Sequence, residues 1–192
     1  YKLPKKVFAH GFFTVNGQKM SKTLGNVIDP IYLANKYGVD ALRYFYAREI
    51  PFGQDGDFSE ESLRNRLNNE LANELGNLVS RTLTLVEKKL KSEIKKDKTD
   101  KSLFENLDVK KIDKLIENLE IHNAIAAIMG FIQDCNYYVN EKAPWHLEGE
   151  KLNKVLYNLA DSLRIISILI QPFMPSSSEK ILKQLNLEIK LK

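Results

Sequence analysis

The chain has 192 residues and a formal net charge of +4; 43% of its residues are hydrophobic and 28% are charged, as in an ordinary soluble globular protein. No apolar run reaches the roughly 18 residues that a membrane span needs, and we find no secretory signal, so we expect a cytoplasmic protein without membrane contact. The single cysteine, Cys135, excludes an intrachain disulfide and a cysteine cluster for zinc, while the mild positive charge permits a polyanionic partner.

The first residues predict a strand followed by a hairpin turn. Residues 3–18 are rich in β-branched and aromatic side chains, and the dipeptide Asn16-Gly17 is typical of a tight turn between strands. We therefore expect an extended strand, a turn and then a lysine-containing loop. His10 could be a catalytic histidine, but we interpret it as a strand-end residue packed beside aromatic side chains.

Two short helices are predicted after the loop. Asp29 is followed by a proline, a pair typical of a helix start, and the first helix covers 31–37 and ends at Gly38. The second helix covers 40–49, where apolar side chains give it buried faces. Residues 52–57 are rich in glycine and aspartate and predict a turn-rich connector.

The rest of the sequence, residues 59–192, predicts an up-and-down helical bundle. Leucines and alanines at helical spacing predict one long helix from about 59 to 91. Cys135 falls within a later helical pattern and is interpreted as a small buried apolar residue. Further helices are predicted over 109–118, 121–141, 153–171 and 177–185. The fold class is therefore mainly α, with a small α/β segment in front of the bundle.

Polar residues predict where two of these helices begin. Asp57 and Glu60 have the spacing of a capping box at the start of the long helix, and Ser59 is the alternative cap. Ser176 and Glu179 have the same spacing before the last helix.

A strongly basic stretch, Lys88–Lys101, follows the long helix. It has little to bury, so we interpret it as a solvated turn or loose loop, with contact to a nucleic acid as the alternative. Residues 186–192 alternate apolar and polar side chains and predict a short strand or a frayed end.

The loop after the hairpin has the residues of a phosphate-binding site. Residues 10–26 read HGFFTVNGQKMSKTLGN, in which Lys19 and Lys22 lie three apart, with a glycine before and after them. Lysine ammoniums are compact charges with three donors, and the hydroxyls of Ser21 and Thr23 add further donors. The residues alone leave two interpretations: a mobile phosphate-binding loop or a solvated surface turn.

This stretch resembles the KMSKS signature loop of the class I aminoacyl-tRNA synthetases, in the version of the methionyl-tRNA synthetases. Thr23 stands where the family pattern has a serine, and both residues carry a hydroxyl. The resemblance implies that Lys19, Ser21 and Lys22 are catalytic. The two lysines would bind the phosphates of ATP and steady the departing pyrophosphate, with Mg²⁺ accompanying ATP and no zinc or other metal site in this chain.

A second group of residues lies in the predicted bundle. Asn77 and Arg81 are one helical turn apart, and Pro144 stiffens the backbone before Trp145. Arginine and asparagine can bind base edges and an indole can stack on an unpaired base, although a lone tryptophan is also a common packing anchor. The words NLVSR and APW resemble the anticodon-binding bundle of methionyl-tRNA synthetases. This implies that Asn77, Arg81 and Trp145 read the CAU anticodon.

The resemblance extends from HGFF to the last helix and implies the C-terminal part of such a synthetase. Residues 1–58 would be the end of the catalytic region, and residues 59–192 the anticodon-binding domain. The parent enzyme would use ATP to attach methionine to tRNA(Met), including initiator tRNA. Because the HIGH signature is absent and residue 1 is not methionine, we expect an inactive fragment of a longer protein. The alternatives are a stand-alone tRNA-binding module and a sister class I synthetase for leucine, isoleucine or valine.

Overall fold

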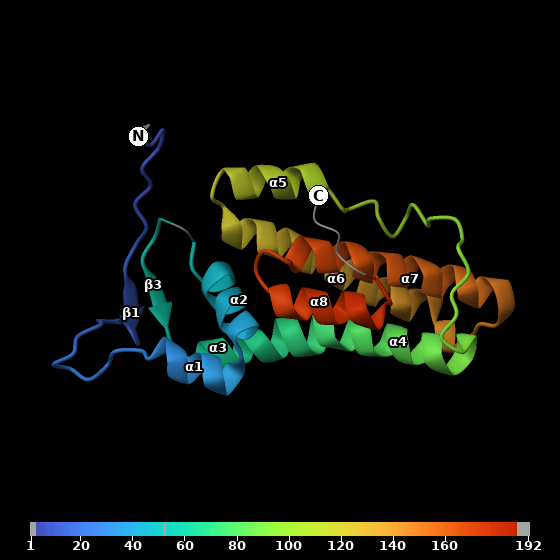
Figure 1. The fold of residues 1–192 in the computed structure, drawn as a ribbon, viewed down its shortest axis with the longest axis horizontal. Helices are drawn as coiled ribbons and strands as arrows, with labels where there is room; N and C mark the ends of the chain where they lie inside the picture. The colour runs from blue at the N-terminus through green and yellow to red at the C-terminus, as the bar shows by residue number, and fades with distance from the viewer. Residues whose placement is uncertain (1–2, 52, 188–192) are drawn as a thin grey trace.

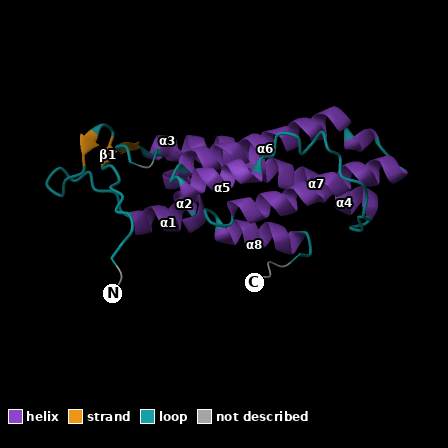
Figure 2. Ribbon diagram, turned by 90° about the horizontal axis from the view of Figure 1, so that it is seen from above, coloured by secondary structure: helices purple, strands orange, loops and turns teal. Residues whose placement is uncertain are grey.

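The computed structural model describes residues 3–51 and 53–187, which form an elongated molecule with a small sheet at one end (Figure 1). The strands lie beside the first helices, and long helices run side by side through the rest of the molecule (Figure 2). This is the predicted arrangement, a helical bundle preceded by a small α/β segment. Within the described ranges, no helix combines the length and the apolar character that crossing a membrane requires.

The sheet has three short strands in the order β2-β1-β3. Asn16 and Gly17 connect β1 to β2 with φ angles of 51° and 74°, which confirms the predicted tight turn. β3 pairs with β1 in parallel, so part of the predicted connector is a strand; Phe52 lies outside the described residues. The strand predicted over 3–18 is much shorter in the structure. The bounds are β1 (Phe13–Val15), β2 (Gln18–Lys19) and β3 (Gly56–Phe58).

Asp57 ties the hairpin to β3 instead of capping the long helix. Its Oδ1 accepts hydrogen bonds from Thr14 Oγ1 at 2.6 Å and from the backbone nitrogen of Gly17 at 2.8 Å. The predicted capping box with Asp57 as the cap is therefore wrong. The alternative cap is confirmed, because Ser59 Oγ accepts a hydrogen bond from the backbone nitrogen of Ser62 at 3.0 Å.

The two short helices agree closely with their prediction: α1 (Pro30–Tyr37) and α2 (Val39–Glu49). Asp29 Oδ1 accepts a hydrogen bond from the backbone nitrogen of Ile31 at 2.9 Å, as an N-cap should. Gly38 ends α1 with a φ of 90°, a value that disfavours other residues. A small core joins α1, α2, β3 and the start of the long helix through Leu33, Leu42, Phe45, Phe58 and Leu63.

The long helix consists of three consecutive segments without a break: α3 (Glu60–Arg66), η1 (Leu67–Gly76) and α4 (Asn77–Leu90). The predicted extent is confirmed, and Lys91 ends the helix in the left-handed region. The middle segment, η1, is π-helical, which the regular leucine spacing did not indicate. A π-helical segment often marks a functional position in a helix.

The other helices of the bundle close a large apolar core. Cys135 in α6 is fully buried, as predicted, and so are Leu156, Leu159 and Leu163 along one face of α7. The capping box predicted for α8 is wrong, since its N-cap residue, Met174, has no capping side chain. The bounds are α5 (Val109–Glu117), α6 (Ile121–Lys142), η2 (Pro144–His146), α7 (Gly149–Ile170) and α8 (Pro175–Gln184). Residues 188–192, part of the predicted tail, lie outside the described residues.

The basic stretch begins in the last turn of α4, and the part that follows is fixed along α7 rather than loose. Asn153 binds the backbone of Lys95 twice, donating to its oxygen and accepting from its nitrogen at 2.9 Å each. The buried side chain of Asn158 accepts from the backbone nitrogen of Asp100 at 2.7 Å. These contacts hold an irregular segment in place without a helix or strand.

His10 lies outside the sheet, three residues before β1, and its side chain is exposed. It is therefore not at the end of a strand, where we expected it. Together with Phe12, Phe13 and Tyr46, it lines an apolar cleft of about 450 Å³ between the first segment and the bundle.

Candidate functional site

The lysine loop is closed by the side chain of Asn26. Asn26 Oδ1 accepts a hydrogen bond from the backbone nitrogen of Ser21 at 2.8 Å, and its Nδ2 donates to the carbonyl of Lys19 at 3.2 Å. Gly25 adds a turn bond to the carbonyl of Lys22 at 3.2 Å and has a φ of 66°. One asparagine therefore brings the two ends of the predicted phosphate-binding sequence together.

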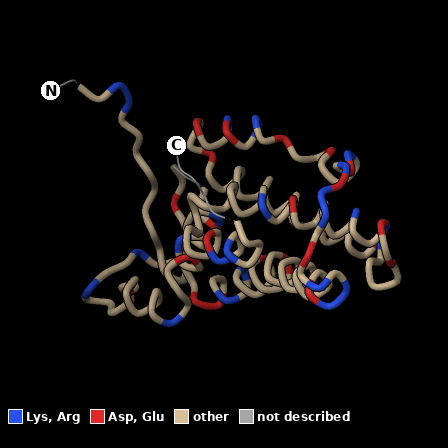
Figure 3. Tube along the Cα trace, turned by 45° about the vertical axis from the view of Figure 1, so that its right-hand side comes forward, with Lys and Arg blue, Asp and Glu red and all other residues tan. Residues whose placement is uncertain are grey.

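The charged groups of this loop are available to a ligand. The side chains of Lys19 and Lys22 are both exposed, and neither ammonium pairs with any residue that the structure describes. The loop projects from the sheet end of the molecule, where Figure 3 shows basic residues recurring along it. Two exposed ammoniums without a described partner, on a projecting loop, can bind a polyanion.

The second predicted group assembles where α4 meets the connection between α6 and α7. The guanidinium carbon of Arg81 lies 5.6 Å from the centre of the Trp145 ring, within the range of a cation–π contact. Trp145 is 40% exposed, so it is not sealed in the core. Arg81 Nη2 also donates to Asn140 Oδ1 at 2.8 Å, which fixes the guanidinium. Asn77 is exposed one turn before Arg81, and its side chain binds no other residue in the described ranges.

This surface combines the flat aromatic ring of Trp145 with the planar cation of Arg81 and the free amide of Asn77. Arg81 and Asn77 lie on successive turns of α4, and Trp145 lies in η2. An indole and a guanidinium can each stack on an unpaired base, and the amide offers both a donor and an acceptor to a base edge. The backbone of the tryptophan turn is fixed as well, because Lys89 Nζ donates to the carbonyl of Trp145 at 2.6 Å. The geometry therefore suits single-stranded nucleic acid.

Comparison with known proteins assigns both parts of the chain, the lysine-loop segment and the bundle, to known families. Residues 1–83 match the family described as tRNA synthetases class I (M), and residues 101–191 match the anticodon-binding domain of tRNA ligase. The chain belongs to the methionyl-tRNA synthetase family. It is 45% identical to the methionine–tRNA ligase of Caldanaerobacter subterraneus and 43% identical to that of Halalkalibacterium halodurans, over 96% and 98% of this chain.

The solved structures agree with this assignment. The Mycobacterium tuberculosis methionyl-tRNA synthetase in complex with methionyl-adenylate superposes with a TM-score of 0.89 at 39% identity, covering 97% of this chain and 39% of that one. The chain spans only 31% and 30% of the two curated relatives. It therefore corresponds in length to about a third of these synthetases.

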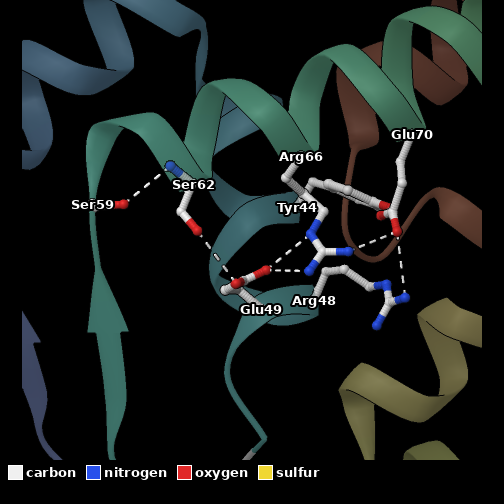
Figure 4. Close-up of polar contacts among 7 residues, drawn as sticks. All are labelled: Tyr44, Arg48, Glu49, Ser59, Ser62, Arg66 and Glu70. Carbon is white, nitrogen blue, oxygen red and sulfur yellow. Dashed lines mark hydrogen bonds and ion pairs between the residues drawn. The ribbon is translucent and has the colours of Figure 1, made fainter.

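In this member of the synthetase family, a polar network links the lysine-loop segment to the long helix (Figure 4). The hydroxyl of Tyr44 and the guanidiniums of Arg48 and Arg66 all bind the carboxylate of Glu70, which lies in the π-helical segment η1. Arg66 also pairs with Glu49 of α2. Burial, reinforced by the hydrogen bond to Glu70, raises the pKa of Tyr44. Because these charges are partly buried and mutually paired, the network favours one orientation of α2 against the helix that carries Asn77.

The sequence predicts candidate ligand-binding residues but does not indicate the residues that hold them in place. Asn26 stands at the end of the signature stretch, but only its hydrogen bonds show that it closes the loop. Lys89 is one of several lysines in a basic run, and no local pattern distinguishes it from Lys88. Asn140 lies in the last turns of α6, and its contact with Arg81 depends on how two distant helices pack.

Proposed function

We propose that this chain is the part of a methionine–tRNA ligase that supplies the phosphate-stabilising loop and reads the anticodon. The whole enzyme would use ATP to activate methionine as its adenylate and would then transfer it to tRNA(Met), including initiator tRNA. The observation that carries the proposal is the pairing of Arg81 with an exposed Trp145, one turn from a free Asn77. The similarity to methionine–tRNA ligases over nearly the whole chain supports it and disfavours a stand-alone tRNA-binding module.

At the ATP end, Lys19 and Lys22 would bind the triphosphate, and Ser21 would add a hydroxyl donor. As the methionine carboxylate attacks the α-phosphate, negative charge grows on the departing pyrophosphate, and the two ammoniums would stabilise it there. This requires no covalent enzyme nucleophile. The complex of the Mycobacterium tuberculosis enzyme with methionyl-adenylate supports ATP as the substrate.

Mg²⁺ would accompany the triphosphate, held by phosphate oxygens. Among the described residues there is no group of three or more His, Cys, Asp or Glu side chains placed to hold a metal ion. We therefore assign neither Mg²⁺ nor zinc a protein ligand or a step in the reaction.

At the other end, Trp145 would stack on a base that has left the anticodon stack. Arg81, already oriented by Asn140 and lying over the indole, would bind the edge of a neighbouring base. Asn77 would contribute a donor and an acceptor to the same trinucleotide, CAU. The pre-formed contacts support this role, because ordering these side chains in advance lowers the entropy cost of binding.

We also propose the division of labour along the chain. Residues 1–58 would complete the catalytic region of the cytoplasmic enzyme, and residues 59–192 would form the anticodon-binding domain. Because the chain spans about a third of its relatives, methionine activation would need the remaining parts of the enzyme. We expect no methionine-dependent pyrophosphate exchange from this chain alone.

The proposal is tested by measuring the affinity of the 192-residue chain for tRNA carrying CAU and for the same tRNA with an altered anticodon. Losing one stacked or hydrogen-bonded base is expected to weaken binding by about 1–3 kcal/mol. Equal affinity for the two RNAs would contradict anticodon reading. Preference for a leucine, isoleucine or valine anticodon would instead identify a sister synthetase.

A further inference from the structure

Lys89 makes an unusual contact for a lysine in a basic run. Its Nζ lies 2.6 Å from the carbonyl oxygen of Trp145 and 3.4 Å from that of Leu147, and it donates to both. It reaches from the last turn of α4 to the short η2 helix between α6 and α7. Lys88, its neighbour, is exposed and pairs with no residue in the described part of the chain. Two adjacent lysines therefore have the same charge and different structural roles.

The turn that Lys89 contacts determines where the indole points. Ala143, just before it, has φ and ψ of 43° and 58°, a left-handed conformation that an alanine adopts only when its surroundings impose it. Pro144 is buried, whereas Trp145 is 40% exposed. The ring of Trp145 contacts the guanidinium of Arg81 and the ring of His146, its own neighbour in the chain. The direction of this partly exposed indole therefore depends on the backbone of the turn and on the contact with Arg81.

We propose that Lys89 is a positioning residue for anticodon recognition. By binding two carbonyls of the 144–147 turn, its ammonium holds the turn against α4, so that the indole faces Arg81 before RNA arrives. This inference rests on the proposed function of Trp145 as a base-stacking residue. Pre-organisation of this kind strengthens binding because less conformational freedom is lost when the complex forms.

The first experiment needs no RNA, because Trp145 is the only tryptophan in the chain and reports its own surroundings. Acrylamide quenching and fluorescence anisotropy are compared for the wild type, Lys89→Met, Lys89→Arg and the matched control Lys88→Met. We expect Lys89→Met to increase quenching and lower the anisotropy, Lys89→Arg to restore much of both, and Lys88→Met to resemble the wild type. Unchanged helical circular dichroism shows that each variant is folded. A folded Lys89→Met variant with wild-type fluorescence would overturn the proposal.

The second experiment measures binding of CAU-bearing tRNA in a double-mutant cycle with Trp145→Ala. Lys89→Met is expected to weaken binding about tenfold, or about 1.4 kcal/mol, in the wild-type background and much less when Trp145 is absent. Lys88→Met, which removes the same charge one residue away, should cause a smaller loss that is independent of Trp145. If Lys89→Met costs the same in both backgrounds, Lys89 acts only as a charge for the phosphate backbone and positioning is refuted.

The two experiments also separate this inference from the proposed function. Suppose that Lys89→Met changes the fluorescence of Trp145, but the wild-type chain binds tRNA carrying CAU and tRNA with an altered anticodon equally well. Then the proposed anticodon reading fails while the structural role of Lys89 stands. If anticodon preference is present and Lys89→Met affects neither fluorescence nor binding, then the proposed function stands and the positioning role fails.

Discussion

The carboxylate of Asp40 in α2 accepts a hydrogen bond from the backbone nitrogen of Ser177 in α8, with Oδ2 at 2.6 Å. The contact satisfies one of the free N–H groups at the start of α8, whose own N-cap residue has no capping side chain. Arg43, in the same helix as Asp40, donates to the carbonyls of Pro172 and Phe173 just before α8. The segment that carries the lysine loop is therefore hydrogen-bonded to the last helix of the bundle.

The first prediction tests this contact. Asp40→Ala should lower the free energy of unfolding by about 1 kcal/mol, the usual cost of losing an N-cap, because the N–H of Ser177 would lose its acceptor. The measurement is urea denaturation followed by circular dichroism. Asp113→Ala is the control, since Asp113 is an exposed aspartate on α5 without a hydrogen bond to a described residue. Equal losses in the two variants would contradict a capping role for Asp40.

A second prediction concerns acid and the hairpin before the lysine loop. Hydrogen bonds from the hydroxyl of Thr14, the larger cause, and from the backbone N–H of Gly17 lower the pKa of Asp57. A carboxyl whose pKa is depressed on folding stabilises the fold at pH values above its unfolded pKa of about 3.9. This stabilisation is lost as the pH falls through the lower pKa of the folded state. The hairpin should therefore loosen only below about pH 4.

The measurement is the pH dependence of the Gly17 amide chemical shift, which follows ionisation of the carboxylate it binds. Thr14→Val removes the hydroxyl donor and should bring the midpoint closer to the unfolded value. An unchanged midpoint in Thr14→Val would show that the hydroxyl does not stabilise the ionised carboxyl. Asp57→Asn should abolish the transition.

Local sequence patterns were sufficient wherever an element is fixed by its near neighbours. Asp29 and Gly38 bound α1, and Asn16-Gly17 turns the hairpin, because each acts within a few residues of its own position. The patterns failed where the partner is distant. β3 forms because it pairs with β1, and α8 is capped by Asp40, 137 residues before Ser177.

The same limit applies to the candidate site. Lys19, Lys22 and Trp145 could be proposed from residue type and motif, because exposed side chains keep their chemistry whatever the fold. The residues that orient them depend on tertiary packing: Asn140 meets Arg81 across 59 residues, and Lys89 meets Trp145 across 56. The π-helical geometry around Glu70, whose carboxylate binds Tyr44 of α2, is likewise not indicated by the spacing of leucines.

A third prediction distinguishes the role of the lysine loop from the role of the surface around Trp145. In the whole synthetase, Lys22→Ala should slow methionine-dependent pyrophosphate exchange by about 10²–10³-fold, the usual effect of removing one group that stabilises transition-state charge. Affinity for tRNA carrying CAU should not change, because Lys22 lies on the loop at the sheet end and Trp145 between α6 and α7 (Figure 1). Lys151→Ala on α7, an exposed lysine without a described partner, is the control. A loss of tRNA affinity in Lys22→Ala would show that the two ends are not independent.

The last prediction decides between the two interpretations of the tryptophan. Trp145→Ala should weaken binding of CAU-bearing tRNA by about 1–3 kcal/mol, since base–aromatic stacking has this strength. The unfolding midpoint should change little, because the indole is 40% exposed and is not among the residues of the buried core. Tyr32→Ala is the control: Tyr32 is an aromatic residue that is 53% exposed and lies on α1, at the sheet end of the molecule (Figure 1). If Trp145→Ala unfolds the chain, or weakens RNA binding no more than Tyr32→Ala does, then the tryptophan does not stack on a base and the proposed reading of the anticodon is wrong.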